Sequence, residues 1–242
     1  MYQFPVLNVE NVFHKMRKIL QVLSSIWLMF ITYFPGPMGF DLRHKFWRKK
    51  FKYLGKNVKI ETGVYFQNPS YIFIDDNCWI DMNVIILAGL DNSEREKIYI
   101  RNKEFKGEPG AVYIRKNVHI GPGCIISGIS AGVYISDNCS LAAKCKVYAF
   151  SHHYRSIKDP KNTKVNFSPL VSQDRQCIIE GPVYLGSNTG AALHTVILPG
   201  VSIPDDCFIM INSVVSPGDY KSNSIISGDP AKRVGERFKS DE

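Results

Sequence analysis

Two adjacent histidines, His152 and His153, lie in the stretch Phe150–Tyr154 and are the residues best suited to move a proton. An imidazole has an ordinary pKa of about 6.5, so it can accept a proton at neutral pH and return it later in a reaction. If the segment is extended, the two side chains point in opposite directions. We therefore expect one of the pair to be a general base, with two ordinary loop histidines as the alternative.

The remaining histidines and the cysteines do not favour a metal or redox site. His119 and His194 fall at separated positions, without the close spacing of a zinc-binding set. The six cysteines include no Cys-x-x-Cys pair, which disfavours a zinc clip and a dithiol redox motif. We expect no bound metal and six buried thiols in a reducing compartment.

Composition narrows the class of protein. The 242 residues are 45% hydrophobic and 21% charged, which is typical of globular proteins and excludes a disordered, collagen-like or polytopic membrane chain. The chain has 30 Lys and Arg residues against 22 Asp and Glu residues, so its formal net charge is +8. This charge favours an anionic partner, whether phosphate groups, nucleic acid or acidic lipid.

A repeat of six residues begins at Leu54 and predicts the fold. An aliphatic residue is followed four positions later by a small one, and the aliphatic residues fall into groups of three, at 54, 60, 66; 74, 80, 86; 114, 120, 126; 135, 141, 147; 179, 185, 191; and 197, 203, 209. A period of six indicates a parallel β-helix, in which three hexads make one triangular coil of about 18 residues. Five of the six cysteines occupy the small inward position, where Cys is a compact apolar filler.

We therefore predict an all-β solenoid of about six coils. Its expected organisation is a helical and basic extension over residues 1–53, the β-helix domain over 54–215, and a C-terminal strand with a short basic tail over 216–242. Two long insertions, over 87–111 and 148–178, both interrupt the repeat after the third member of a group. They should project from one edge of the solenoid, where a site is usually built. The charged stretch Asp91–Gly110 of the first insertion either closes over a substrate or is solvated.

The N-terminal extension contains a predicted helix over residues 12–34, followed by Pro35–Gly36–Pro37 as a stop. Its uncharged part, Ile19–Phe34, has 16 residues, fewer than the roughly 20 that a bilayer span needs. Two alternatives remain: the helix packs on its own domain or another subunit, or it is an interfacial anchor. In the second case acidic lipid would face a basic run that follows the helix, consisting of Arg43, Lys45, Arg48, Lys49, Lys50, Lys52 and Lys56.

Several motifs together resemble a known family. The hexads, the His-bearing segment Phe150–Tyr154, the stretch Ile197–Ile203 and the closing Gly228–Lys232 are similar to the hexapeptide-repeat acyltransferases. Within these the chain most resembles galactoside, maltose and capsule or O-antigen sugar O-acetyltransferases, over roughly residues 52–238. The resemblance implies a left-handed parallel β-helix, a homotrimer, acetyl-CoA as the acyl donor, and a site between adjacent subunits.

The resemblance also implies roles for individual residues. The family's catalytic histidine follows a hexad pair shaped like Leu141–Val147, and counting onward reaches His152 as the general base. His153 and Asn83 are the implied substrate-binding residues. The implied residues for binding coenzyme A are Ala192, Leu193, Ile211, Ser216, Lys232 and Arg233. This chain departs from the family pattern at Gly190, Pro204 and 210–212, which leaves another acyl-CoA open as the donor.

The sequence thus predicts a cytoplasmic sugar O-acetyltransferase that acts on a cell-surface polysaccharide or its precursor, with peripheral contact at the inner face of the membrane. An amino-sugar N-acetyltransferase or an antibiotic acetyltransferase is the alternative within the same scaffold. A non-catalytic scaffold is a further alternative. A zinc hydratase is disfavoured by the histidine spacing. No nucleic-acid partner is expected, because the aromatic residues within the basic run are not accompanied by a recognised nucleic-acid motif.

Overall fold

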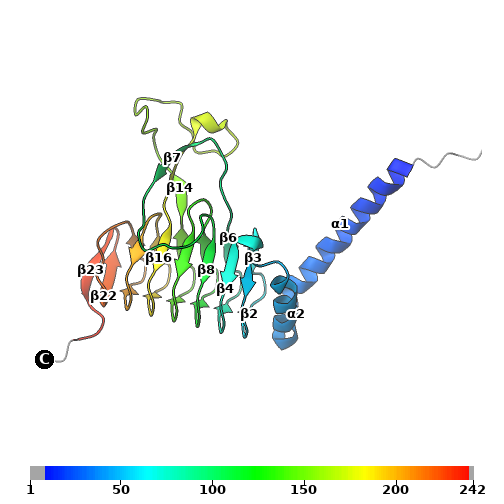
Figure 1. The fold of residues 1–242 in the computed structure, drawn as a ribbon, viewed down its shortest axis with the longest axis horizontal. Helices are drawn as coiled ribbons and strands as arrows, with labels where there is room; N and C mark the ends of the chain where they lie inside the picture. The colour runs from blue at the N-terminus through cyan, green and yellow to red at the C-terminus, as the bar shows by residue number, and fades with distance from the viewer. Residues whose placement is uncertain (1–8, 240–242) are drawn as a thin grey trace, which may run out of the picture.

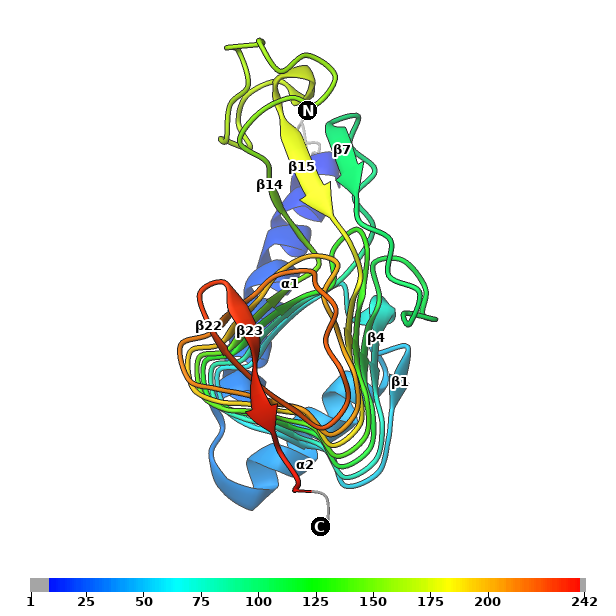
Figure 2. The ribbon, with the colours of Figure 1, turned by 90° about the vertical axis from the view of Figure 1, so that its left-hand side faces the viewer.

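A three-sided column of short parallel strands forms the body of the protein, and two helices lie at one end of it (Figures 1 and 2). The computed structural model describes residues 9–239, so the first eight residues of the N-terminal extension and the last three of the tail lie outside it. The helices are α1 (Val9–Tyr33) and α2 (Gly36–Arg48).

Each face of the column is one sheet. The first sheet contains β1 (Tyr53–Leu54), β4 (Ile72–Ile74), β8 (Val112–Ile114), β11 (Val133–Ile135), β16 (Val183–Leu185) and β19 (Ser202–Ile203). The second contains β2 (Lys59–Ile60), β5 (Trp79–Ile80), β9 (His119–Ile120), β12 (Ser140–Leu141), β17 (Gly190–Ala191), β20 (Phe208–Ile209), β22 (Ser224–Gly228) and β23 (Ala231–Glu236). The third contains β3 (Tyr65–Gln67), β6 (Ile85–Leu87), β10 (Ile125–Ser127), β13 (Lys146–Tyr148), β18 (Val196–Ile197) and β21 (Val214–Val215). The chain visits the three sheets in turn, an arrangement that fits a left-handed parallel β-helix.

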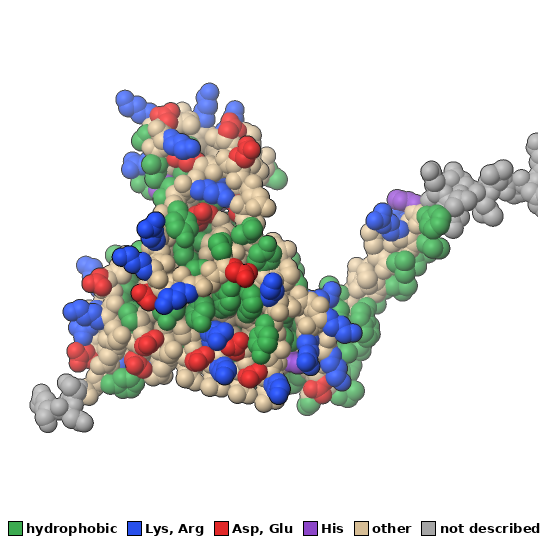
Figure 3. All heavy atoms as spheres, viewed as in Figure 1, with side chains coloured by type: hydrophobic (Ala, Val, Ile, Leu, Met, Phe, Trp, Pro, Cys, Tyr) green, Lys and Arg blue, Asp and Glu red, His purple; other side chains and the backbone are tan. Residues whose placement is uncertain are grey.

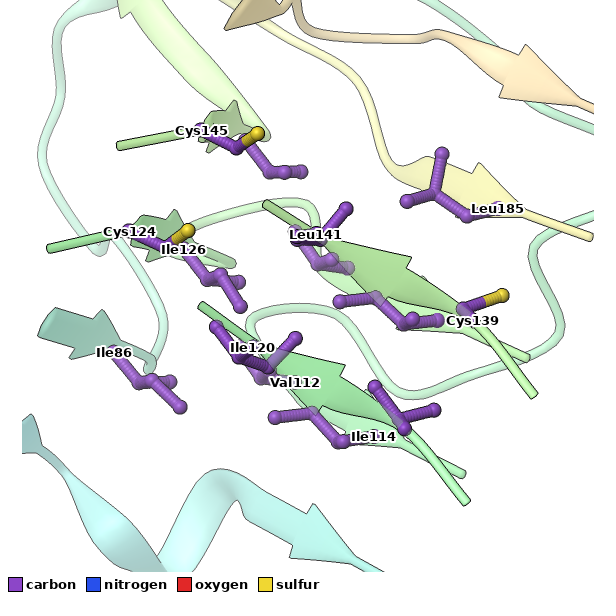
Figure 4. Packing of buried hydrophobic residues seen from close by; sticks show 14 of the residues in the cluster. Ile86, Val112, Ile114, Ile120, Cys124, Ile126, Cys139, Leu141, Cys145 and Leu185 are labelled. Atoms are coloured by element: carbon purple, nitrogen blue, oxygen red, sulfur yellow. The ribbon is translucent and has the colours of Figure 1, made fainter. Parts of the chain in front are cut away.

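The aliphatic residue of each hexad points into the column and is the reason the strands stack. Ile80, Ile120 and Leu141 come from successive strands of the second sheet and are fully buried. Figure 4 shows the same stacking for Ile86 and Ile126 of the third sheet. Burial of one such side chain contributes about 1.5–3 kcal/mol, so the columns of aliphatic side chains supply the hydrophobic core.

The predicted frame is wrong after the second insertion. Ile179 was expected to begin a coil, but it belongs to a sheet outside the column. The column resumes at β16, so Leu185, Ala191 and Ile197 share one pass and Ile203 begins the next. Ile179 followed by Val183 imitates a hexad because a strand of any sheet can carry alternating apolar residues.

Asparagines line the corner between the first and second sheets. Asn57, Asn77, Asn117 and Asn138 all have positive φ, near +60°, a conformation that Asn tolerates better than most residues. Their side-chain amides form a ladder along the corner: Asn57 donates to Asn77 (3.2 Å), Asn77 to Asn117 (3.3 Å), and Asn117 to Asn138 (2.9 Å). The corner is therefore held both by backbone conformation and by bonds from one pass to the next.

The cysteines are buried and free, including the five at inward hexad positions. Burial raises the pKa of the Cys78 thiol to about 12 and that of Cys139 to about 11. Such thiols stay protonated at neutral pH, so these two serve as apolar filling and not as nucleophiles.

The second helix was not predicted. Phe34 and Pro35 separate two helices, and Pro37 does not prevent the second one because proline is tolerated in the first turn of a helix. The α2 helix covers the N-terminal end of the column, where Trp47 stacks on Phe51 at 5.5 Å between ring centroids and meets Phe66 edge-on at 4.8 Å. Trp47 and Phe51, two of the aromatic residues within the basic run, are therefore core residues.

Arg43 does not belong to a lipid-facing surface, contrary to the expectation for the basic run. Its side chain is 1% exposed. Its guanidinium donates to the carbonyl oxygens of Phe34 (2.7 Å), Ile31 (3.2 Å) and Ile60 (2.6 Å). Arg43 thus ties the C-terminal end of α1 to α2 and to the first pass of the column.

The opposite end of the column is covered by the C-terminal hairpin. The β22 strand adds to β20 in parallel, and β23 returns antiparallel to β22. Tyr220 packs on the core there and donates a hydrogen bond through its hydroxyl group to the carbonyl oxygens of Ser216 (3.0 Å) and Ala231 (3.2 Å). Both ends of the hydrophobic core are therefore closed by chain segments that do not follow the hexad pattern.

Replacing Arg43 with Met should lower the free energy of unfolding by about 3 kcal/mol, because three buried carbonyl groups lose a charged donor. Urea unfolding of the full chain measures this. The matched variant is Arg48→Met on the exposed side of the same helix, for which we expect a change within about 0.5 kcal/mol. Equal losses in the two variants would show that the charge of α2, and not the buried hydrogen bonds, stabilises the junction.

Candidate functional site

A small sheet outside the column carries the histidine pair. It consists of β7 (Glu96–Tyr99) from the first insertion, and β14 (Phe150–His152) and β15 (Cys177–Glu180) from the second. The β15 strand pairs parallel to β7 and antiparallel to β14. Both insertions leave the column after a strand of the third sheet, so the expectation that they project from one edge is confirmed. We call residues 91–100 and 150–180 the flap; it stands above the column in Figure 1.

One carboxylate fastens the two insertions to each other. Glu96 on β7 accepts hydrogen bonds from the Ser156 hydroxyl (2.6 Å) and from the backbone N–H groups of Ile157 (2.7 Å) and Lys158 (2.9 Å). Desolvation by burial opposes ionisation of Glu96, but these three hydrogen bonds outweigh it and lower the pKa of the carboxyl below its ordinary value. Glu96 therefore holds residues 156–158 in its ionised form.

His152 is the last residue of β14 and lies in a partly covered position at the foot of the flap. Its Nδ1 atom is buried and has no hydrogen-bond partner among the described residues. Its ring meets Phe167 edge-on, at 6.5 Å between centroids. A buried polar atom without a partner is uncommon and costly, so this nitrogen has the capacity to bind a group that the single chain does not supply.

His153 is held by its own loop. Its backbone N–H donates to the Cys177 carbonyl oxygen at 2.8 Å, and its Nδ1 lies 2.7 Å from the Arg155 carbonyl oxygen. A carbonyl oxygen only accepts, so Nδ1 carries the proton and Nε2 has the free lone pair. His153 is thus also oriented to accept a proton, and geometry alone leaves both histidines as candidates for the base.

The sequence pattern does not indicate an acidic residue near His152, but the strand register places one on the same face of the small sheet. Phe150 lies opposite Glu180, so His152, two residues further on, shares a face of the sheet with Glu180. Diagonal neighbours of this kind are about 7–8 Å apart. The Ser130 hydroxyl donates a hydrogen bond to the Glu180 carboxylate. A carboxylate so placed would stabilise the positive charge that His152 gains on accepting a proton.

Three of the residues predicted to bind coenzyme A lie together. Ser216, Lys232 and Arg233 line one cavity of about 300 Å³, whose other walls include Tyr220 and Pro230. Lys232 is exposed. Arg233 is engaged with its own chain, because it donates to Glu236 at 2.9 Å and to Ser224 at 3.1 Å.

The other predicted binding residues lie at a different corner. Ala192, Leu193 and Ile211 occupy the corner between the second and third sheets, where Leu193 is 44% and Ile211 is 51% exposed. Asn83 lies at the same corner, nearer the N-terminal end, with φ of +56°. Within one chain the predicted set is therefore divided between the two edges of the third sheet, and Asn83 is not brought to His152.

The structure also shows what surrounds one departure from the family pattern. A Cβ atom added to Gly190 would lie 3.1 Å from the ring of Phe208, which comes from the next pass. Phe208 is 37% exposed. Phe208, which the sequence analysis did not single out, thus presents an aromatic ring beside Gly190.

The first insertion divides into two parts: residues 91–100 belong to the flap together with His152, whereas residues 101–104 lie along the column. Asn102 donates to the carbonyl oxygens of Pro182 (3.0 Å) and Val201 (3.1 Å), which binds this segment to the outer face of the first sheet. A cavity of about 600 Å³ lies there, lined by residues such as Arg101, Tyr184 and Asp219. It is larger than the cavity at Ser216, but neither histidine lines it, so its size alone does not make it the candidate site.

Metal-ligating side chains do not gather in the described part of the chain. Among residues 9–239, no three His, Cys, Asp or Glu side chains are placed to hold a metal ion. His119 pairs with Asp81 at 3.4 Å, and His194 sits at a corner with φ of +61°. Neither histidine therefore needs a bound metal to account for its position.

Comparison with known proteins shows what this architecture is related to. No protein-family model matches the chain. A dTDP-4-amino-4,6-dideoxy-D-glucose acyltransferase of Escherichia coli is 26% identical over 189 residues, which cover 78% of this chain and 84% of that protein. The putative lipopolysaccharide biosynthesis O-acetyl transferase WbbJ of Escherichia coli K12 is 28% identical over 127 residues, 52% of this chain and 60% of that protein. The chain is thus similar in sequence to two sugar acyltransferases.

Solved structures share the fold. A variant of AntD, an N-acyltransferase from Bacillus cereus in complex with dTDP and coenzyme A, superposes with a TM-score of 0.65 at 20% identity, covering 81% of this chain and 90% of that one. A hexapeptide-repeat acetyltransferase from Vibrio cholerae, complexed with acetyl coenzyme A, superposes with a TM-score of 0.51 at 17% identity, covering 98% and 94%. These likenesses support the hexapeptide-repeat scaffold.

Acidification should release the contact that Glu96 makes between the insertions. Because its folded-state pKa is lowered, the stabilisation is complete above the ordinary carboxyl pKa of about 4.3 and is lost as the pH falls through the folded value. Hydrogen exchange should show that protection of the Ile157 and Lys158 amides is lost only at a pH below the ordinary carboxyl pKa. Glu96→Ala should remove this protection at neutral pH.

The control for this prediction is Glu94→Ala, a neighbouring exposed carboxylate that accepts none of these bonds. In this variant the amides of Ile157 and Lys158 should retain wild-type protection. If Glu96→Ala also leaves them protected, residues 156–158 are held by something other than this carboxylate.

Proposed function

We propose that the protein transfers an acetyl group from acetyl-CoA to a hydroxyl group of a sugar in a cell-surface polysaccharide or its precursor. The observation that carries the proposal is a histidine on a projecting flap, sharing a sheet face with a carboxylate, in a relative of two sugar acyltransferases. The six free cysteines fit a reducing compartment such as the cytoplasm.

His152 acts as the general base in this reaction. As the sugar oxygen attacks the thioester carbonyl carbon, the hydroxyl proton passes to the imidazole. The tetrahedral intermediate then collapses, the carbon–sulfur bond breaks, and the imidazolium returns the proton to the leaving thiolate. Glu180 stabilises the transient imidazolium across the face of the small sheet. The products are an acetylated sugar and free coenzyme A.

Lys232 and Arg233 bind the phosphate groups of the donor in the cavity beside Ser216. Arg233 must exchange its ion pair with Glu236 for this contact, whereas Lys232 is free to make it directly. The pantetheine arm needs an apolar wall, which Leu193 and Ile211 provide from the other edge of the third sheet.

These two edges meet only if protein chains associate. The outer surface of the third sheet and its corner with the second sheet carry apolar residues such as Tyr65 (55% exposed), Met82 (47%), Leu193 and Ile211. The corner with the asparagine ladder is instead polar, with residues such as Lys116 at the tip. We propose a homotrimer in which the apolar corner of one subunit meets the flap edge of the next, so that the binding residues from both corners share one site.

An amino-sugar N-acyltransferase is the second candidate. The relative that covers more of this chain is named for a dTDP-linked amino sugar, and AntD is an N-acyltransferase in complex with dTDP. An amine that is deprotonated needs less help from a base than a hydroxyl group does, so dependence on the histidine should be weaker for an amine acceptor.

Release of free coenzyme A from acetyl-CoA in the presence of a sugar acceptor measures the proposed reaction. His152→Ala should lower kcat by about 10²- to 10⁴-fold, because a positioned base contributes that much. His153→Ala should lower it by about tenfold or less. The same loss in His153→Ala alone would assign the base to His153. Turnover of dTDP-amino sugars but not of hydroxyl acceptors would favour the second candidate, and no turnover of either class would support a non-catalytic scaffold.

Charges placed at the apolar corner should break the association and the activity together. Leu193→Asp combined with Ile211→Asp should reduce the mass measured by light scattering to that of one chain, and should lower kcat/KM by at least about tenfold. Lys56→Asp at the polar corner is the control and should leave both unchanged. A fully active single-chain variant would contradict a site shared between subunits.

A further inference from the structure

The helix α1 leaves the body of the protein and carries a continuous apolar face (Figures 1 and 3). The residues of this face follow one another every three or four positions, and each is at least 45% exposed: Met16, Ile19, Leu20, Leu23, Ile26, Trp27 and Phe30. Of the large apolar side chains of α1, Ile31 alone is buried among the described residues. A soluble domain rarely exposes an apolar face of this length unless something binds it.

The opposite side of α1 is polar. Residues at the complementary helical positions are His14, Arg17, Lys18, Gln21, Ser24, Ser25 and Thr32. The hydroxyl groups of Ser24 and Ser25 donate to the Gln21 carbonyl oxygen, and that of Thr32 donates to the Leu28 carbonyl oxygen. The helix is therefore amphipathic, with a wide apolar arc and a polar stripe that begins with cations.

The apolar face is too short for a helix that crosses a bilayer. Its uncharged stretch, from Ile19 to Phe34, rises about 24 Å at 1.5 Å per residue, against a hydrocarbon core of about 30 Å. None of the helices in residues 9–239 combines the length and the apolarity that a bilayer-spanning segment requires. A wide apolar arc on a helix of this kind is typical of one that lies along an interface.

Cations gather where α1 meets the body. Lys45, Arg48, Lys49, Lys50 and Lys52 are exposed, and Figure 3 shows Lys and Arg side chains around α2. A groove of about 320 Å³ separates the helices, lined on α1 by residues including Trp27 and Leu28, on α2 by Phe46, and beyond the end of α2 by Lys50. The Lys50 ammonium lies 4.8 Å from the centroid of the Phe46 ring. An apolar groove with a cation at its edge matches a molecule with an apolar chain and an anionic head.

We propose that α1 binds the surface of an anionic lipid bilayer, with its apolar face in the acyl region and the cations at the end of α2 and just after it against the headgroups. Charge complementarity selects lipid as the occupant, because five exposed cations at the junction of α1 with the body attract an anionic surface. This placement holds the column at the membrane and does not depend on which acceptor the flap serves. Arg43 takes no part in lipid contact, since it fixes the angle between the two helices from inside the junction.

Flotation of the full chain with vesicles tests the proposal. The wild type should float with phosphatidylglycerol-containing vesicles, less with pure phosphatidylcholine, and less again at high salt. Leu23→Asp combined with Ile26→Asp should reduce the floated fraction at least about tenfold. Lys49→Glu combined with Lys50→Glu should remove the preference for anionic vesicles. The control is Lys103→Glu combined with Lys106→Glu in the first insertion, which should float as the wild type does.

Quenching by brominated lipid acyl chains gives a second, local measurement. Trp27 should be quenched on vesicle binding, while Trp47 is buried in the junction and Trp79 lies on the second sheet. Trp27→Phe should therefore lose most of the quenching while still floating.

Either of two results would overturn the proposal: a wild type that does not float with anionic vesicles, or a Leu23→Asp, Ile26→Asp variant that floats as well as the wild type. If the wild type does not float and the same double variant has a lower mass than the wild type in lipid-free solution, a second copy of α1 is the occupant instead. These results are independent of the coenzyme A assay, so failure here leaves the proposed function standing.

Discussion

The inward aliphatic residue of each hexad is the constraint on which the rest of the structure depends. A strand of two or three residues is unstable alone, so the strands of this protein exist only because each pass of the chain packs its aliphatic side chains on those of the next. A shift of one residue would turn Ile80 or Ile120 toward water, and this fixes the register along the whole column. The same register determines where the corner asparagines lie and where both insertions leave the column.

The hexads predicted the strands from Leu54 to Val147 because burial on a three-sided column imposes a period that side chains must obey. The prediction failed at Ile179, where a strand of the small sheet carries the same local pattern but pairs with a segment distant in sequence. The second helix was missed for a local reason, since the proline, glycine and basic residues of 35–48 look like a stop followed by a solvated run. Nothing in the sequence near Arg43 indicates that its partners are the carbonyl groups of another helix and of a strand.

The same reasoning predicted only part of the candidate site. The interruption of the hexad repeat identified the segment that bears His152, because residues outside the repeat are not required to fill the core. Glu180 shares a sheet face with that histidine through pairing between strands, and Ser130 bonds Glu180 from a short turn between passes; neither leaves a periodic pattern in the sequence. The residues expected to hold coenzyme A were divided between two edges, which a linear sequence does not distinguish.

The small sheet that carries the histidine pair is separate from the three sheets of the column. Glu96 fastens its two insertions to each other, and Glu180 accepts a hydrogen bond from Ser130 of the column. Changes in the length or side chains of the flap leave the hexad register intact, so O- and N-directed relatives can share one column while differing in what they acylate.

The closed ends of the column have a consequence for how the molecule behaves at high concentration. Stacked parallel strands present unpaired N–H and C=O groups at their terminal rungs, which is the geometry from which fibrils grow. Here α2 with Trp47 covers one terminus and the β22–β23 hairpin covers the other. The column therefore cannot be extended by end-to-end pairing of its strands with those of other copies.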